Sequence, residues 1–195
     1  MNKYKICIWM IIILTFCGCS QNTELNEIAA IVNGENIYQE EILNVLNDDK
    51  NLTYDVVLQN TIDDLLLIQY GIELGMEVSD QDVEERFSEV VSLSPMIEEK
   101  IEKFGIDKYK DILKNVITIE KVKKDYLSKY EKDLQVTDAE IDNWYRENIN
   151  GEYLKSPSIR EQVEQVIYDK KVDDSINRLI EELRNSATIK IIEVK

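Results

Sequence analysis

The stretch from Ile28 to Ile42, IAAIVNGENIYQEEI, predicts a strand, a tight turn at Asn33-Gly34, a second short strand and the start of a helix. A lone two-stranded hairpin is only marginally stable in water. The chain must therefore supply a further strand elsewhere. This requirement constrains the fold more than any other feature of the sequence.

The missing strand is predicted at the other end of the chain. The closing segment NSATIKIIEVK carries β-branched residues at Ile189, Ile191 and Ile192, which are typical of a strand. We expect this strand to complete a small sheet with the opening hairpin. The two ends of the folded part of the chain then lie together.

The sequence between these strands predicts helices. Only six glycines and two prolines occur in 195 residues, which favours long helices. Apolar residues recur at spacings of three or four, and the run LLLI at 65–68 indicates a central, buried helix. The predicted fold class is mainly α with a small β-sheet, and its helices lie at about 37–48, 51–76, 79–91, 94–105, 106–130, 136–148 and 159–184.

Capping residues mark where several of these helices begin. Ser79 is followed three residues later by Asp82, and Thr137 is followed by Glu140, so each pair predicts a capping box. Pro95 follows a serine and fits the first position of a helix, where its missing N–H costs nothing.

The first eighteen residues have the layout of a secretory signal peptide. Two lysines precede the apolar run ICIWMIIILTF, which is short for a membrane-spanning helix, and CGCS follows. Gly18 before Cys19 resembles a bacterial lipobox, in which the cysteine receives diacylglycerol. We expect a signal peptide at 1–18, a tether at 19–27 and one domain at 28–195. An uncleaved N-terminal anchor is the alternative.

Composition excludes several classes of function. All three cysteines lie at or before Cys19, so the mature chain has neither a disulfide framework nor a thiolate metal site. The net charge of −16 disfavours nucleic-acid binding. The chain has no histidine and no phosphate-binding glycine loop. Acidic pairs such as Asp63-Asp64 fit solvated helix faces better than a cation site. The sequence therefore predicts neither a cofactor nor a metal.

The order of the segments resembles that of SurA- and PrsA-type secretion foldases. AAIVNGENIYQEEI is similar to the family's opening, and TIDDLLLIQYGIELGMEVSDQDVEE, KFGIDKYKDILKNVITIEKV and VTDAEIDNWYREN are similar to the segments that follow. The closing helix and strand resemble the family's return into its N-terminal lobe. This resemblance covers nearly all of the chain after residue 28. It implies a SurA N-terminal, trigger-factor-C-like helical chaperone domain.

The chain departs from PrsA-like proteins at one point. Those proteins carry a parvulin-type prolyl isomerase domain before the last helix, whereas here only the segment INGEYLKSPS stands there. Ten residues are far fewer than the ~50 of a small domain. The parvulin active site relies on histidines, which this chain lacks. We therefore expect a chaperone core without isomerase activity, and hence no enzyme.

The resemblance implies a lipid-anchored holdase that binds unfolded or newly secreted polypeptides outside the cytoplasmic membrane without ATP. An adaptor that binds one specific envelope or secreted partner is the alternative, and a residual prolyl isomerase is a third. The shared sheet leaves a swapped homodimer open beside a monomer.

Aromatic residues are the candidates for client binding, because Tyr and Trp offer apolar area with a polar tip. The resemblance places several of them around a cradle. The expected binding residues are Tyr109, Tyr126, Trp144 and Tyr145. The alternative is that these side chains belong to the core.

Overall fold

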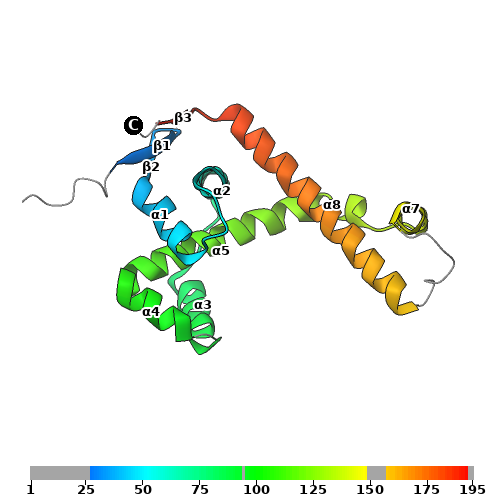
Figure 1. Cartoon of the computed structure of the whole chain (residues 1–195), viewed down its shortest axis with the longest axis horizontal. Coiled ribbons are helices and arrows are strands. Elements are labelled where there is room, and N and C mark those ends of the chain that lie inside the picture. Colours follow the sequence, from blue (N-terminus) through cyan, green and yellow to red (C-terminus); the bar gives the residue numbers. More distant parts are fainter. Residues whose placement is uncertain (1–26, 94, 149–156, 193–195) are drawn as a thin grey trace, which may run out of the picture.

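The computed structural model describes residues 27–93, 95–148 and 157–192 (Figure 1). The signal peptide, Cys19, nearly all of the tether and the segment at 149–156 lie outside the described residues. The predictions made for them therefore stay predictions.

Strands from the two ends of the described chain form one antiparallel sheet. β1 (Ile28–Val32) lies between β2 (Glu35–Tyr38) and β3 (Ile189–Ile191). Ala30 of β1 pairs with Ile37 of β2 on one side and with Ile191 of β3 on the other. The predicted third strand and the predicted fold class are confirmed.

The turn between β1 and β2 also fastens the sheet to the helices. Asn33 adopts a left-handed conformation with φ of 52°, and Gly34 follows with φ of 89°. The Asn33 N–H donates to the Thr188 carbonyl over 2.9 Å, and the Asn33 Oδ1 accepts from the Thr188 N–H over 2.8 Å. Its Nδ2 donates to the Gln69 Oε1 over 2.8 Å. One side chain thus joins the hairpin turn to β3 and to a helix.

The described helices follow the predicted order, with one addition. They are α1 (Gln39–Asp48), α2 (Tyr54–Glu73), α3 (Asp80–Leu93), α4 (Pro95–Phe104), α5 (Ile106–Lys129), α6 (Glu131–Leu134), α7 (Asp138–Asn148) and α8 (Pro157–Ser186). The addition is α6, which was not predicted because a single turn of four residues is too short to show helical periodicity.

Both predicted capping boxes are present. The Ser79 Oγ accepts from the Asp82 N–H over 3.1 Å, and the Ser79 N–H donates to the Asp82 Oδ2 over 3.1 Å. The Thr137 N–H donates to the Glu140 Oε2 over 2.7 Å, and the Glu140 N–H donates to the Thr137 Oγ1 over 3.3 Å. These contacts satisfy N–H groups that the helices themselves leave unpaired.

Three clusters of buried side chains hold the fold together. The sheet core joins the sheet, α1 and α2 and comprises Ala29, Ala30, Val32, Ile37, Ile42, Val57, Leu58, Ile62 and Leu66. The crossing core joins α2, α5 and α8 and comprises Leu67, Val122, Tyr126, Ile176 and Leu179. The third cluster lies between the helices α3 and α5, away from the β-hairpin, and is called the hairpin core after this helical pair. It comprises Val78, Val83, Tyr109, Leu113 and Ile117. Because α2 serves two of these cores, its predicted central position is confirmed.

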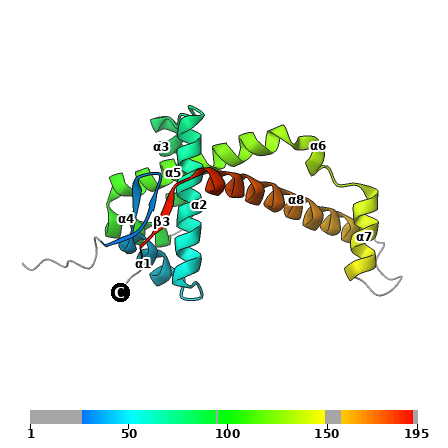
Figure 2. The ribbon, with the colours of Figure 1, turned by 90° about the horizontal axis from the view of Figure 1, so that it is seen from above.

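The described chain forms a lobe and a projecting arm. The lobe contains the sheet, α1 to α4 and the first part of α5, whereas α6, α7 and the start of α8 lie far from the sheet in both views (Figures 1 and 2). Lys171 of α8 holds the arm together, because its Nζ donates to the Gln135 carbonyl over 2.7 Å and to the Glu140 Oε1 over 2.8 Å.

Arg184 anchors the other end of α8 to α2. Its guanidinium donates to Asp63, to the Gln59 Oε1 over 2.9 Å and to the Gln59 carbonyl over 3.1 Å.

Among the helices described, none is both long enough and apolar enough to cross a membrane.

Candidate functional site

The main apolar hollow of the lobe lies between α1 on one side and α4 and α5 on the other. We call it the α1–α5 groove, and its volume is about 570 Å³. Its lining residues are Tyr38, Glu40, Glu41, Asn44, Val45, Asp48, Ile97, Lys100, Lys108, Tyr109, Ile112, Leu113 and Val116. This volume lies within the range of ~300–1,000 Å³ that is typical of binding pockets.

Large apolar side chains stay exposed in this groove. The exposed fractions are 38% for Tyr38, 43% for Val45, 41% for Ile112 and 38% for Val116. Single exposed apolar residues are common on protein surfaces, but several around one hollow indicate an interaction site. The groove therefore offers apolar surface that the fold itself leaves unburied.

The amount of apolar surface on α5 explains why this groove exists. Leu113 and Ile117 point into the hairpin core and Val122 into the crossing core. Ile112 and Val116 lie beside these positions, where the described helices leave them half-exposed. The apolar stripe of α5 is thus wider than the face that the two cores cover.

The two walls of the groove belong to different cores. α1 is fixed to the sheet core through the buried Ile42, whereas Ile97 of α4 packs against the hairpin core. An ion pair between the Lys100 Nζ and the Asp48 Oδ2, 3.0 Å long, joins the two walls. Because both side chains are well exposed, such a pair stabilises this contact only weakly.

Charges surround the apolar lining unevenly. Glu40 and Glu41 lie on the α1 wall, and within the described part of the chain neither forms an ion pair. On the opposite wall Lys100 is paired with Asp48, and Lys108 also lines the groove. The described lining thus carries three carboxylates, those of Glu40, Glu41 and Asp48, against two ammonium groups, so its charge balance is acidic.

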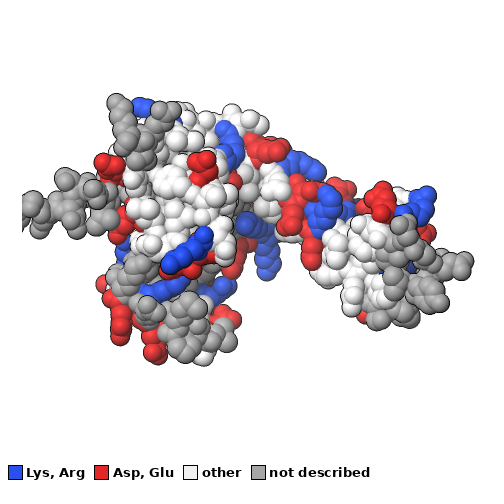
Figure 3. Space-filling view, in the orientation of Figure 1, with Lys and Arg blue, Asp and Glu red and all other residues white. Residues whose placement is uncertain are grey.

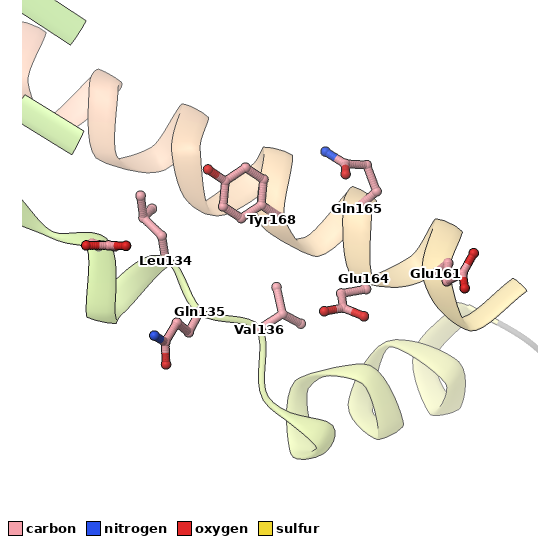
Figure 4. Close-up of a pocket in the computed structure, with 8 residues that line it drawn as sticks. Leu134, Gln135, Val136, Glu161, Glu164, Gln165 and Tyr168 are labelled. Atoms are coloured by element: carbon pink, nitrogen blue, oxygen red, sulfur yellow. The ribbon is translucent and has the colours of Figure 1, made fainter. Parts of the chain in front are cut away.

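A second hollow lies in the arm, between α8 and the chain that joins α6 to α7. Its volume is about 700 Å³, and Leu134, Val136 and Tyr168 face it together with polar and acidic side chains (Figure 4). Those other lining residues are Glu131, Gln135, Glu161, Glu164 and Gln165.

Within the described residues, no three acidic, cysteine or histidine side chains are placed to hold a metal ion.

The surface of the lobe differs in charge from the surface of the arm. In the orientation of Figure 3, acidic and basic side chains alternate along the arm, whereas a broad, mainly uncharged area covers the lobe where α1 and α2 lie. In this view the surface over α1 and α2 is therefore less charged than the surface of α8.

The structure separates the four predicted client-binding residues. Tyr109 lines the groove, but it is only 8% exposed, and its ring packs edge-on against Phe87 with centroids 6.2 Å apart. Trp144 and Tyr145 lie on α7 in the arm, both half-buried, with ring centroids 5.9 Å apart. The structure thus brings only Tyr109 to the groove, and the client-binding role of all four stays a prediction.

Tyr126 has a structural environment unlike that of a surface residue. It is 5% exposed in the crossing core, and its ring lies 4.9 Å from that of Tyr130. Burial raises the pKa of the Tyr126 hydroxyl to about 12. Tyr126 is therefore part of the crossing core and not of an exposed surface.

Residues that the sequence analysis did not single out make up most of the exposed apolar lining. Ile112 and Val116 fit the helical stripe of α5 and look like ordinary core positions in the sequence. The detectable signal was the width of that stripe, because residues 109, 112, 113, 116, 117 and 119 are too many for one buried face. Tyr38 and Val45 gave no comparable signal.

Comparisons with known proteins show the fold. No family model matches the chain, and no curated protein sequence matches it. Among solved structures, it is similar to a chain from the structural study of the virulence factor PEB4 and the periplasmic protein Cj1289, two structurally related SurA-like chaperones of Campylobacter jejuni. The TM-score is 0.58 at 11% sequence identity, over 86% of this chain and 100% of that chain. The described chain therefore has a SurA-like fold.

Proposed function

We propose that this protein is an extracytoplasmic chaperone that holds unfolded polypeptides without ATP. The observation that carries this proposal is the α1–α5 groove, where Tyr38, Val45, Ile112 and Val116 remain exposed on a SurA-like fold. The solved structure that it resembles is described as that of a SurA-like chaperone.

The groove supplies a physical basis for binding without nucleotide. An unfolded segment that covers these side chains removes apolar area from water, which contributes ~25 cal/mol for each Å². Because only four large apolar side chains among the described residues of the groove are exposed, we expect this area to be limited and the binding to be weak and reversible. A client is released when it folds and buries the same apolar groups itself.

We further propose that the protein is anchored by a lipid outside the cytoplasmic membrane. Residues 1–18 direct export, Cys19 carries the lipid, residues 19–27 form the tether and residues 28–195 form the chaperone domain. A diacyl anchor binds membranes more firmly than a single acyl chain does. The domain then works at the outer face of the cytoplasmic membrane, where unfolded secreted chains emerge.

Isomerase activity is not part of this proposal. The chain contains no histidine, and the segment between α7 and α8 is too short for a parvulin domain. A proline-peptide exchange assay tests this point directly. We expect no acceleration of cis/trans exchange, and any acceleration above the uncatalysed rate contradicts the proposal.

Several unrelated denatured proteins distinguish a general chaperone from a dedicated adaptor. We would dilute each of them into the chain from Ser20 onward and follow aggregation by light scattering. A general chaperone lowers aggregation of most clients in proportion to its concentration. Protection of none of them rejects the proposal and favours an adaptor, whose partner a pull-down from the membrane surface then identifies.

A further inference from the structure

The construction of the α1–α5 groove restricts the form in which a polypeptide can occupy it. Apart from Tyr38, every lining residue lies on a helix. Backbone groups within a helix already bond to one another, and the Tyr38 N–H donates to the Glu41 Oε1 over 3.1 Å. The groove therefore offers the main chain of a ligand few free backbone groups, and its other polar groups belong to side chains such as those of Glu40 and Asn44.

The lack of a strand edge disfavours an extended occupant. The N–H and C=O groups of a strand stay unpaired wherever no lining side chain reaches them, and each unpaired group carries a desolvation cost. A helix satisfies these groups internally and presents only side chains. Recognition of an amphipathic helix by an apolar groove uses apolar anchors spaced three or four residues apart.

The charge balance of the groove selects the residues that flank the apolar stripe of such a helix. Three lining carboxylates outnumber the two lining lysines, Lys100 and Lys108. Neither Glu40 nor Glu41 on the α1 wall forms an ion pair among the described residues. Basic side chains beside the apolar stripe therefore find complementary charge on this wall. Acidic side chains at the same positions meet repulsion.

We propose that the α1–α5 groove binds one amphipathic helical segment of a polypeptide client, with lysine or arginine beside its apolar stripe. This inference rests on the proposed chaperone function and names the class of segment that the chaperone holds. The segment becomes helical when it binds to the groove, since short isolated helices are only marginally stable in water. Its anchors cover Tyr38, Val45, Ile112 and Val116.

Three labelled peptides of about sixteen residues, or four helical turns, test the inference. The first has leucines at helical spacing with lysines beside the stripe. The second has the same composition with leucines at every other position, as in a strand. The third replaces the lysines by glutamates. Fluorescence anisotropy measures their binding to the chain from Ser20 onward, which contains every described element, and circular dichroism measures their helicity.

We expect the first peptide to bind and gain helicity, and the other two to bind about tenfold more weakly or worse. Ile112→Ser weakens the first peptide about tenfold. Ile72→Ser is the matched control, because Ile72 is 68% exposed on α2 and does not line the groove. Equal binding of the first two peptides, or equal effects of the two variants, overturns the inference.

The peptide assay and the aggregation assay test different claims, so one can give a negative result while the other gives a positive one. Protection of denatured clients without binding of the helical peptide overturns the helical mode and leaves the chaperone function intact. Groove-dependent binding of the peptide without protection supports the helical mode and rejects the general chaperone.

Discussion

At the scale of single residues, Asn33 joins three parts of the lobe. Replacing it with alanine removes the side-chain hydrogen bonds to Thr188 and Gln69. Alanine must then adopt the left-handed φ of 52° without hydrogen bonds that hold its side chain there. We expect Asn33→Ala to lower the free energy of unfolding by about 2 kcal/mol, measured by urea denaturation.

Asn36→Ala is the matched control for that substitution. The Asn36 side chain makes one long hydrogen bond, 3.4 Å, to the Tyr38 hydroxyl. We expect a loss below about 1 kcal/mol. Equal losses for the two variants contradict the joining role of Asn33.

Glu140 makes the stability of the arm depend on pH. The Lys171 ammonium, and then the backbone N–H and hydroxyl of Thr137, donate to its carboxylate and lower its pKa from 4.5 to about 2. Because the pKa is depressed in the folded state, the carboxylate stabilises the fold above pH 4.5. This contribution disappears as the pH falls toward 2.

Unfolding of the wild type and of Glu140→Gln at several pH values tests this sign. We expect the wild type to be more stable at neutral pH, and the gap to close as the pH falls from 4.5 to about 2. Glu147→Gln, an exposed position on the same helix, serves as the control. A gap for Glu140→Gln that stays constant over this range refutes the assignment.

At the scale of elements, the fold depends on the close crossing of α2 and α5. A Cβ added to Gly71 meets the Thr118 Cγ2 at 2.8 Å and the Val122 Cγ2 at 2.9 Å. Both neighbours are β-branched and stiff within a helix, so they retreat poorly. The clash outweighs the helix propensity that alanine adds, which is about 1 kcal/mol.

We therefore expect Gly71→Ala to destabilise the protein by about 1–2 kcal/mol in thermal or urea unfolding. Glu73→Ala, two residues further along the same helix and exposed, provides the control and changes stability little. Stabilisation by Gly71→Ala shows instead that the two helices separate easily.

Local chemistry made most elements predictable from the sequence. Asn33-Gly34 specified a hairpin turn, and the Ser79 and Thr137 capping boxes located two helix starts, because these signals act between neighbours in the chain. The one-turn α6 carried no periodic signal. The groove was also not predictable, since it arises from the distance between α1 and α5, which the periodicity of either helix leaves undetermined.

At the scale of the whole molecule, the proposed binding surface lies apart from the buried cores that stabilise the fold. The cores enclose the buried side chains of α1 and α5, whereas the groove lies at the seam between two cores and keeps apolar side chains exposed. The net charge of −16 counteracts self-association of such a surface. A chaperone needs this combination, because it must present apolar area without aggregating.

The most direct test of this account is protection by variants of the groove. In light-scattering assays of denatured clients, we expect Ile112→Ser combined with Val116→Ser to lose most of the protection. Ile72→Ser should protect as the wild type does, although it removes a more exposed apolar side chain. Circular dichroism confirms that each variant is folded. Equal protection by both variants contradicts the central claim that the α1–α5 groove holds the client.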